Sequence, residues 1–264
     1  MSIITRILGP KVDKEELTEH QGRYRKPKLL FTVAALVLGI SILFPYWQLK
    51  LEAPQFPDGL DVNAYVNRLE GDVQELEGLN HYVGIPSFDS GAVLERSVSV
   101  AGILVLAGLL LAALYIHSRW VLVLALPALV FPFFFMADMQ YWLWNYGHSL
   151  DPVAPLSSAV GEFTPPLFGP GEIAQFDTLA WPGPGLILAL AAAILTGIGL
   201  WYHRKAYKPL VEEMFAREAR RAEQVEAAGE PAATDSVDTD EPHERRRGQL
   251  VDEGQPAAVD RSPR

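Results

Sequence analysis

Long apolar runs alternate with polar connections along the chain. Four of these runs, residues 29–46, 98–116, 120–136 and 185–202, contain no charged side chain. A helix rises about 1.5 Å per residue, so roughly 17 to 25 apolar residues cross the hydrocarbon core of a bilayer. One such run is compatible with a buried helix of a soluble protein, but four in a chain of 264 residues indicate membrane crossings. The pattern predicts an all-α membrane protein with four transmembrane helices, in a membrane domain spanning residues 29–202.

The two longest connections, residues 47–97 and 137–184, differ in composition. In the first, apolar and polar residues alternate between 60 and 66, which predicts a strand, and the apolar spacing from 72 to 82 predicts a helix. Gly84 follows this helix as a stop signal. The second connection is rich in Pro and Gly, so we expect it to be ordered without regular structure. The pattern therefore predicts a small strand-helix cap on the membrane domain.

The two ends of the chain are polar. Residues 1–28 are expected to form a short N-terminal arm, with a surface helix at 11–20. Residues 203–226 carry interleaved charges at helical spacing, which predicts a further helix. Residues 227–264 contain almost nothing to bury, so we predict a disordered acidic tail.

Basic residues are distributed unevenly along this arrangement. Of the 22 Lys and Arg residues, seven precede the first apolar run and eleven follow the last one. Three lie in the first long connection, one lies between the second and third runs, and none lies in the second long connection. Positive charge is retained on the cytoplasmic side of a membrane. We therefore expect a multi-pass protein of the cell inner (cytoplasmic) membrane, with both termini cytoplasmic and both long connections extracytoplasmic.

Composition and motifs narrow the classes of function. The chain has no cysteine, which excludes disulfides, thiolate metal sites and covalent attachment of c-type haem. It also lacks a phosphate-binding GxxxxGK[ST] loop, a GxSxG nucleophile elbow and an HExxH zinc motif. The four apolar runs hold no ionisable group at mid-depth, where ion-coupled transporters place them. We expect a protein without catalytic activity, in contact with the lipid bilayer and with no nucleic-acid partner.

Candidate metal ligands gather at the end of the third apolar run, in the stretch ADMQYWLWNYGHSLDP at residues 137–152. Thioether and imidazole are the protein ligands that remain for Cu(I) when cysteine is absent. The helix-face spacing and the predicted topology place the candidates on the same side of the membrane as the one histidine of the first long connection. The candidate ligand set is Met136, Asp138, Met139, His148 and His81.

This stretch also has a simpler interpretation. Trp and Tyr concentrate where a membrane helix meets water, because one part of the ring is apolar and another forms hydrogen bonds. The four aromatic residues between 141 and 146 are explained in this way without any ligand. A histidine in a loop, such as His81, is also more often structural than a metal ligand.

Two further histidines, His117 and His203, lie at the predicted cytoplasmic ends of two helices. Paired histidines on neighbouring helices can hold a haem. Each is followed within two residues by an arginine, however, and cations at a helix C-terminus are ordinary anchors. There is no second histidine pair in the apolar runs. We therefore favour copper over haem as the cofactor.

Four segments carry a resemblance to a known family: LEAPQFPDGLDVNAYVNRLEGDV, LEGLNHYVGI, ADMQYWLWNYGHSLDP and EFTPPLFGPGEIAQFDT. They resemble multi-pass membrane accessory proteins encoded in bacterial nitrous-oxide reductase gene clusters. The resemblance covers roughly residues 29–202. It implies a role in denitrification, in the assembly or copper supply of an extracytoplasmic copper enzyme. It also implies periplasmic copper-enzyme maturation proteins or an ABC transporter as partners.

Three functions remain open at this point. The leading one is an integral membrane accessory protein for a copper enzyme, which the resemblance implies is nitrous-oxide reductase, that passes copper between weak Met and His ligands. The alternatives are a haem-binding membrane electron-transfer subunit and a metal-free membrane scaffold that docks a periplasmic partner.

Overall fold

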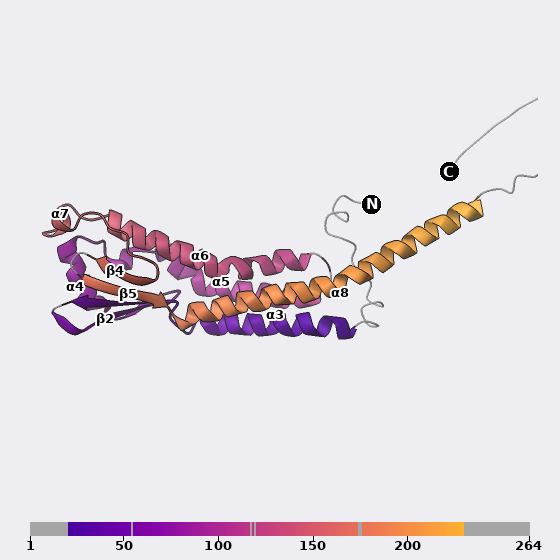
Figure 1. Ribbon diagram of the computed structural model, residues 1–264, viewed down its shortest axis with the longest axis horizontal. Coiled ribbons are helices and arrows are strands. Elements are labelled where there is room, and N and C mark those ends of the chain that lie inside the picture. The colour runs from indigo at the N-terminus through magenta and orange to yellow at the C-terminus, as the bar shows by residue number, and fades with distance from the viewer. Residues whose placement is uncertain (1–20, 54, 117, 119, 174–175, 230–264) are drawn as a thin grey trace, which may run out of the picture. The chain divides into compact units, whose positions relative to one another are not determined.

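The computed structural model describes residues 21–53, 55–116, 118, 120–173 and 176–229. Residues up to Ala219 belong to one compact unit, and all contacts below lie within it. Four long helices form a bundle: α3 (Gln21–Ser41), α5 (Val93–Ala112), α6 (Trp120–His148) and α8 (Pro184–Gly229) (Figure 1). A short 3-10 turn, η2 (Ala113–Tyr115), continues α5.

Three of these helices are long and apolar enough to cross a membrane: Val93–Tyr115, Trp120–His148 and the Pro184–Val225 part of α8. The chain is therefore a multi-pass membrane protein. The fourth predicted crossing differs, because α3 ends at Ser41 and carries four basic residues in its first turns. This leaves a shorter uncharged run than the predicted helix over 29–46.

Helix boundaries also differ from the prediction. The helix predicted over 120–136 continues to His148 in α6, so the stretch proposed as a site is the last part of that helix. The helices predicted over 185–202 and 203–226 are joined in α8, because no helix-breaking glycine or turn signal separates them. The predicted surface helix at 11–20 and nearly all of the predicted tail lie outside the described residues.

The largest correction concerns the two long connections, which build one five-stranded antiparallel sheet. The first supplies β1 (Trp47–Ala53), β2 (Phe56–Ala64) and β3 (Leu69–Gly71), and the second supplies β4 (Gly169–Ile173) and β5 (Phe176–Pro182). The strand order is β3-β2-β1-β5-β4. The cap that these two connections form is thus not a single strand and helix, and the Pro/Gly-rich connection does have regular structure.

The pairing of β1 with β5 explains why local sequence does not reveal this sheet. Leu49 lies opposite both Val62 of β2 and Ala180 of β5, so β1 is the central strand and its partners come from distant segments. Leu49 and Leu51 are buried, which gives β1 one apolar face. The β4 segment GPGEI has little strand propensity of its own, and it is extended because it pairs with β5.

The remaining helices lie beside the sheet. The predicted helix over 72–82 is present as α4 (Val73–Val83), and it ends at Gly84 in the left-handed conformation (φ 88°). Glycine adopts this conformation without the steric cost that other residues pay. Two short elements, η1 (Phe88–Ser90) and α7 (Ser157–Val160), complete the region.

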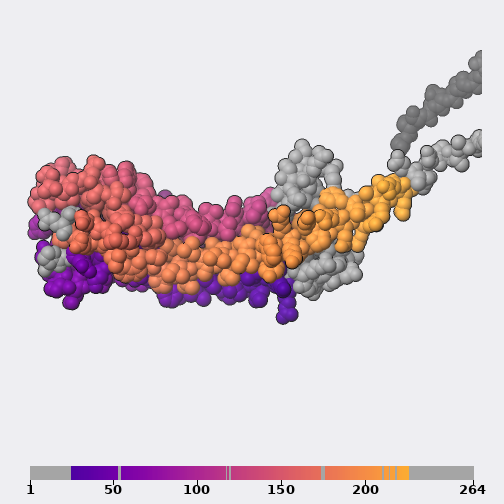
Figure 2. All heavy atoms as spheres, viewed as in Figure 1, coloured from indigo at the N-terminus to yellow at the C-terminus, as the bar shows by residue number. Residues whose placement is uncertain are grey.

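Two apolar clusters hold this unit together. One lies inside the bundle and includes buried residues of α3, α5, α6 and α8, such as Phe31, Leu38 and Ile103. The other lies between the sheet, α4 and the end of α6. Phe135 of α6 packs against both clusters, so α6 links the bundle to the sheet. In the face shown in Figure 2, the atoms of α8 lie between those of α6 and those of α3.

The motif WPGPG is a packing motif at the junction of sheet and bundle. The Gly183 amide donates to the carbonyl of Tyr46 at 2.9 Å, and the Gly185 amide donates to that of Pro45 at 2.8 Å. A Cβ on Gly183 would lie 2.2 Å from the carbonyl oxygen of Pro45. Side chains would therefore prevent this close approach, and the two glycines bring the start of α8 against the turn before β1.

Candidate functional site

A large cavity lies where the sheet meets the bundle. It has a volume of about 690 Å³, and its walls come from the sheet, α4, the first half of α5 and the second half of α6. Most of the lining is apolar, for example Leu49 and Val62 from the sheet, Leu76 from α4 and Ile103 from α5. Each wall contributes some residues to one of the two packed clusters.

Two polar nitrogen atoms in the lining are unpaired. Asn80 of α4 is only 4% exposed, and Trp142 lies in α6. The side-chain amide nitrogen of Asn80 (Nδ2) and the indole nitrogen of Trp142 (Nε1) are both buried, and neither has a hydrogen-bond partner among the described residues. A buried N–H without an acceptor costs about 1–3 kcal/mol. Both groups are donors, but these atoms have almost no accessible surface, so neither donor faces the open space of the cavity.

Charged residues lie at the same cavity. Asp138 of α6 and Glu95 of α5 line it together with Arg96. The Arg96 guanidinium donates to the main-chain carbonyl of Asp89 at 2.7 Å. The lining therefore carries two carboxylates and one guanidinium, and the guanidinium already has a neutral partner.

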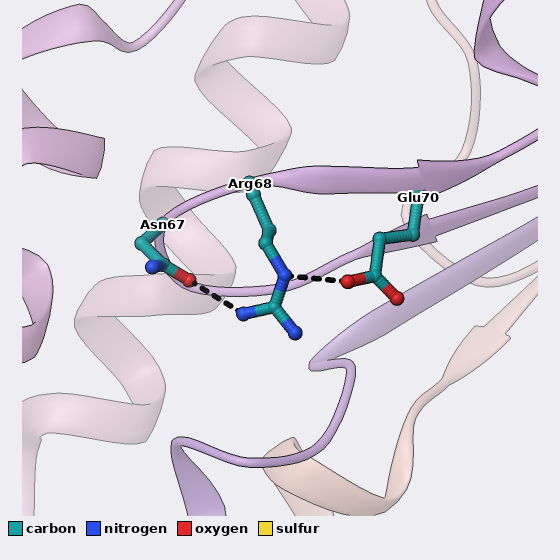
Figure 3. Close-up of polar contacts among 3 residues, drawn as sticks. All are labelled: Asn67, Arg68 and Glu70. Carbon is teal, nitrogen blue, oxygen red and sulfur yellow. Dashed lines mark hydrogen bonds and ion pairs between the residues drawn. The ribbon is translucent and has the colours of Figure 1, made fainter.

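Arg68 lies in the turn between β2 and β3, and it contacts three neighbouring side chains. Its Nε donates to the Glu70 carboxylate at 2.5 Å, and its Nη1 donates to the side-chain oxygen of Asn67 at 3.1 Å (Figure 3). Its guanidinium also lies 4.0 Å from the ring centroid of Tyr65. Tyr65 in turn lines the cavity. The Arg68 hydrogen bond lowers the pKa of the exposed Glu70 carboxyl.

The five predicted metal ligands lie in different environments. Met136 packs against the core of the bundle. Asp138 and Met139 both line the cavity. His81 is exposed on α4, where its ring centroid lies 6.1 Å from that of Tyr82. Of the five, the structure thus brings only Asp138 and Met139 to one cavity.

His148 is held by its own neighbours at the end of α6. Its Nδ1 lies 2.8 Å from the carbonyl oxygen of Trp144, and its ring stacks on that of Trp144 with centroids 4.7 Å apart. A carbonyl only accepts hydrogen bonds, so Nδ1 carries the proton of the neutral ring. Nε2 lies 3.8 Å from the carboxylate of Glu162.

Within the described ranges, no three His, Asp or Glu side chains lie close enough together to hold a metal ion. His81, Asp138 and His148 therefore do not form one site with the separated arrangement seen here. Copper binding by these residues stays a prediction, and no chemical step is derived from it.

The stretch 137–152 has structural roles that its sequence did not reveal. Gly147 lets the main chain of Phe163 approach closely, since a Cβ on Gly147 would lie 1.9 Å from the Phe163 carbonyl oxygen. The amide of Asp151 donates to the carbonyl of Gly84 at 2.8 Å, which joins this stretch to the end of α4. Tyr146 packs edge-on against Phe88, with ring centroids 5.5 Å apart.

The aromatic residues of this stretch divide into two groups. Tyr141 and Trp144 are 54% and 46% exposed, as the interface interpretation predicts. Trp142 and Tyr146 instead line the cavity, which the sequence analysis missed. Asn80 was also missed as a site residue, although its position four residues after the buried Leu76 places an amide on the apolar face of α4.

The alternative haem site is described only in part. His203 is buried in α8, and its ring stacks with that of Tyr207 at 6.1 Å between centroids. It borders a small cleft with Phe31 of α3 and Ile116. His117 lies outside the described residues, so the pairing of the two histidines stays a prediction.

Comparisons of the chain with protein-family models, with curated proteins and with solved structures find no match.

Proposed function

We propose that the protein crosses the cytoplasmic membrane four times, with α3 as the additional crossing and both termini in the cytoplasm. The unequal distribution of Lys and Arg supports this orientation. The packing of α3 supports the count, because Phe31 and Leu38 of α3 are buried in the same core as the other three helices. The sheet and α4 then form an extracytoplasmic cap.

This topology can be tested by labelling, since the natural chain has no cysteine. Asp58 of β2 and Glu213 of α8 are both exposed, so each can be replaced by cysteine with little disturbance. A membrane-impermeant maleimide should label the Asp58→Cys variant in intact spheroplasts and the Glu213→Cys variant only after lysis. Equal labelling of both variants in intact spheroplasts would refute the proposed orientation.

The role proposed for this cap is that of an accessory surface in the assembly or copper supply of an extracytoplasmic copper enzyme, with nitrous-oxide reductase as the leading candidate. One observation carries the proposal. The four segments that resemble the accessory family lie in two distant parts of the chain, 51–85 and 137–178, and they contribute β2, β3, β4, most of α4, the end of α6 and parts of β1 and β5. The resemblance thus concentrates in the folded cap and its cavity, as expected for a surface on which a function depends.

The arrangement of the candidate ligands favours a scaffold over a copper relay. A relay through His81 and His148 requires the two imidazoles to share one ion, whereas His148 is engaged by Trp144 and Glu162 and His81 is exposed on α4. In the proposed role the cap docks a periplasmic maturation protein or the ABC transporter of the same system, and copper stays on that partner.

The decisive experiment is deletion of the gene in its source organism, followed by measurement of copper per molecule of purified nitrous-oxide reductase. Deletion should lower the copper content, and the natural chain should restore it. A His81→Ala/His148→Ala double variant should also restore it if the cap is a scaffold, whereas failure of this folded variant would favour a copper relay. Unchanged copper content after deletion would refute the accessory role.

A further inference from the structure

The cavity between the sheet and the bundle is open on the outer side of α5 and α6. Its lining includes Val98 and Val105 of α5, which are 52% and 60% exposed, and Phe134 of α6, which is 63% exposed. Both helices are apolar enough to cross a membrane, so exposed apolar side chains in their membrane parts face hydrocarbon. The cavity is therefore continuous with the hydrocarbon core of the bilayer.

The cavity also continues past the level at which these helices leave the hydrocarbon. Charged side chains avoid the bilayer core, so Glu95 and Arg96 of α5 and Asp138 of α6 mark that level. Val98 and Phe134 lie about one helical turn from these residues, on the membrane side. The opposite walls come from the sheet and α4, which lie beyond the end of α3 (Figure 1). One continuous space thus connects the bilayer with the inside of the cap.

The walls on the cap side are mainly apolar. Leu49 and Val62 of the sheet and Leu76 of α4 line the cavity there. The unpaired nitrogen atoms of Asn80 and Trp142 have almost no accessible surface, so they do not face this space. The cap side therefore favours a hydrocarbon chain over a polar head.

An apolar space of this size does not stay empty beside a fluid bilayer. Its volume of about 690 Å³ lies within the range of about 300 to 1,000 Å³ that small-molecule sites usually enclose. Water is a poor occupant of apolar walls, because each buried water needs about two to four polar partners. An empty space would lose the dispersion contacts of every wall. A hydrocarbon chain restores these contacts without giving up a hydrogen bond.

We propose that one acyl chain of a membrane phospholipid enters between α5 and α6 and fills this cavity as far as the apolar face of the sheet. The head of the lipid stays at the level of Glu95, Arg96 and Asp138, and its second chain stays in the bilayer. A phospholipid is the source because it is the bulk hydrocarbon around both helices. This site is independent of the proposed accessory function, since it concerns the cavity and not the docking of a protein partner.

The first test is photo-crosslinking of the full chain in phosphatidylcholine nanodiscs that contain a phosphatidylcholine with a diazirine near the end of one acyl chain. Illumination should attach this lipid to α5 and α6 and also to the peptides that contain Leu49 and Leu76, which mass spectrometry identifies. Ordinary lipid contact labels the membrane helices alone, because the ends of acyl chains otherwise stay near the middle of the bilayer. Label on the helices without label on the Leu49 and Leu76 peptides would overturn the proposal.

The second test blocks the opening of the cavity. Gly102 of α5 lines the cavity, and a Cβ added there meets no atom within 4 Å, so Gly102→Phe places a ring at the opening without a clash at its Cβ. Gly108 of the same helix has equally open space but lies outside the lining, which makes Gly108→Phe the control. Label on the Leu49 and Leu76 peptides should be lost in Gly102→Phe and retained in Gly108→Phe, with both variants folded by circular dichroism. Undiminished label in the folded Gly102→Phe variant would overturn the cavity as the site.

Competition distinguishes the phospholipid from other sources of an acyl chain. Oleate carries such a chain on a free carboxylate, and a tripalmitoylated lipopeptide carries it on a peptide. Each of them, added to the nanodiscs in the same amount, should reduce the label on the Leu49 and Leu76 peptides no more than unlabelled phosphatidylcholine does. Stronger competition by oleate would replace the phospholipid by a fatty acid, and stronger competition by the lipopeptide would replace it by the anchor of a lipoprotein. Either result would overturn the proposal.

Discussion

Replacement of Gly185 by alanine tests the junction between the cap and the bundle most directly. A Cβ at this position would lie 2.5 Å from Cδ2 of Tyr46 and 2.6 Å from the carbonyl oxygen of Phe44. The ring of Tyr46 cannot move aside easily, because it is fully buried and its hydroxyl lies 2.6 Å from the hydroxyl of Ser41. The main chain must therefore shift to accept the methyl group.

Gly197, in the same helix α8, provides the matched control. A Cβ there would lie 3.7 Å from Cδ1 of Leu129, which is an ordinary van der Waals contact. Alanine in a helix interior is favoured over glycine by about 0.8–1 kcal/mol, so we expect Gly197→Ala to raise the free energy of unfolding by about that amount. An overpacked side chain costs about 1–3 kcal/mol. Gly185 is the second residue of α8, so alanine gains less helix propensity there than in the helix interior. We therefore expect Gly185→Ala to lower the free energy of unfolding by about 1–2 kcal/mol.

The assay is unfolding in dodecyl maltoside by increasing mole fractions of sodium dodecyl sulfate, followed by circular dichroism and by tryptophan fluorescence. The two glycine-to-alanine changes are chemically identical, so helix propensity alone would shift both midpoints in the same direction. The structure requires shifts of opposite sign. Stabilisation of both variants would show that the start of α8 does not pack against Tyr46 as described.

Three further predictions concern single contacts. Gly84→Ala should destabilise the cap by about 1–2 kcal/mol in the same assay, because its φ of 88° strains any other residue and a Cβ would meet main-chain atoms of the connection after α6. The Ser41 hydroxyl donates to the main-chain carbonyl of Leu38, so it accepts the hydrogen bond of the Tyr46 hydroxyl. Ser41→Ala should therefore lower the free energy of unfolding by about 1–3 kcal/mol, because it leaves the buried Tyr46 hydroxyl without an acceptor. Adding Tyr46→Phe to that variant should restore part of the loss, because it removes the unpaired hydroxyl. Arg68→Met should raise the lowered pKa of Glu70, which infrared titration of the carboxyl can measure. A carboxylate with a lowered pKa adds stability above its unfolded-state pKa, and this stability is lost as the pH falls through the folded-state pKa. The difference in unfolding free energy between Arg68→Met and the natural chain should therefore shrink in acid. A difference that stays constant with pH would contradict this prediction.

Elements whose signal is local could be predicted from the sequence. The long apolar runs identified α5, α6 and α8 as membrane helices, and the spacing of Leu76 and Val83 with Gly84 after them identified α4. Their lengths were less predictable, because α6 continues beyond the apolar run that ends at residue 136, and the added part packs on the sheet through Met139 and Leu143.

The candidate site was predictable only in part. Asp138 and Met139 were selected for their chemistry, and both do line the cavity. His81 and His148 were placed on one side of the membrane by topology, but a shared side does not establish a shared site. Asn80 and Trp142 were not selected, because an unpaired N–H becomes visible only when every neighbour of that atom is known.

By itself, the sequence determined that this is a multi-pass membrane protein, because transfer of an uncharged apolar run into hydrocarbon depends on composition and length alone. It also determined α4, whose helical period and glycine stop act over a few residues. Tertiary structure alone decided the five-stranded sheet and the cavity. β1 pairs with β5 across more than a hundred residues, and the walls of the cavity come from segments that only this pairing brings together. Hydrogen bonds between distant strands leave no local periodic signal, so the same Pro/Gly-rich residues could be read as a loop until their partners were in place.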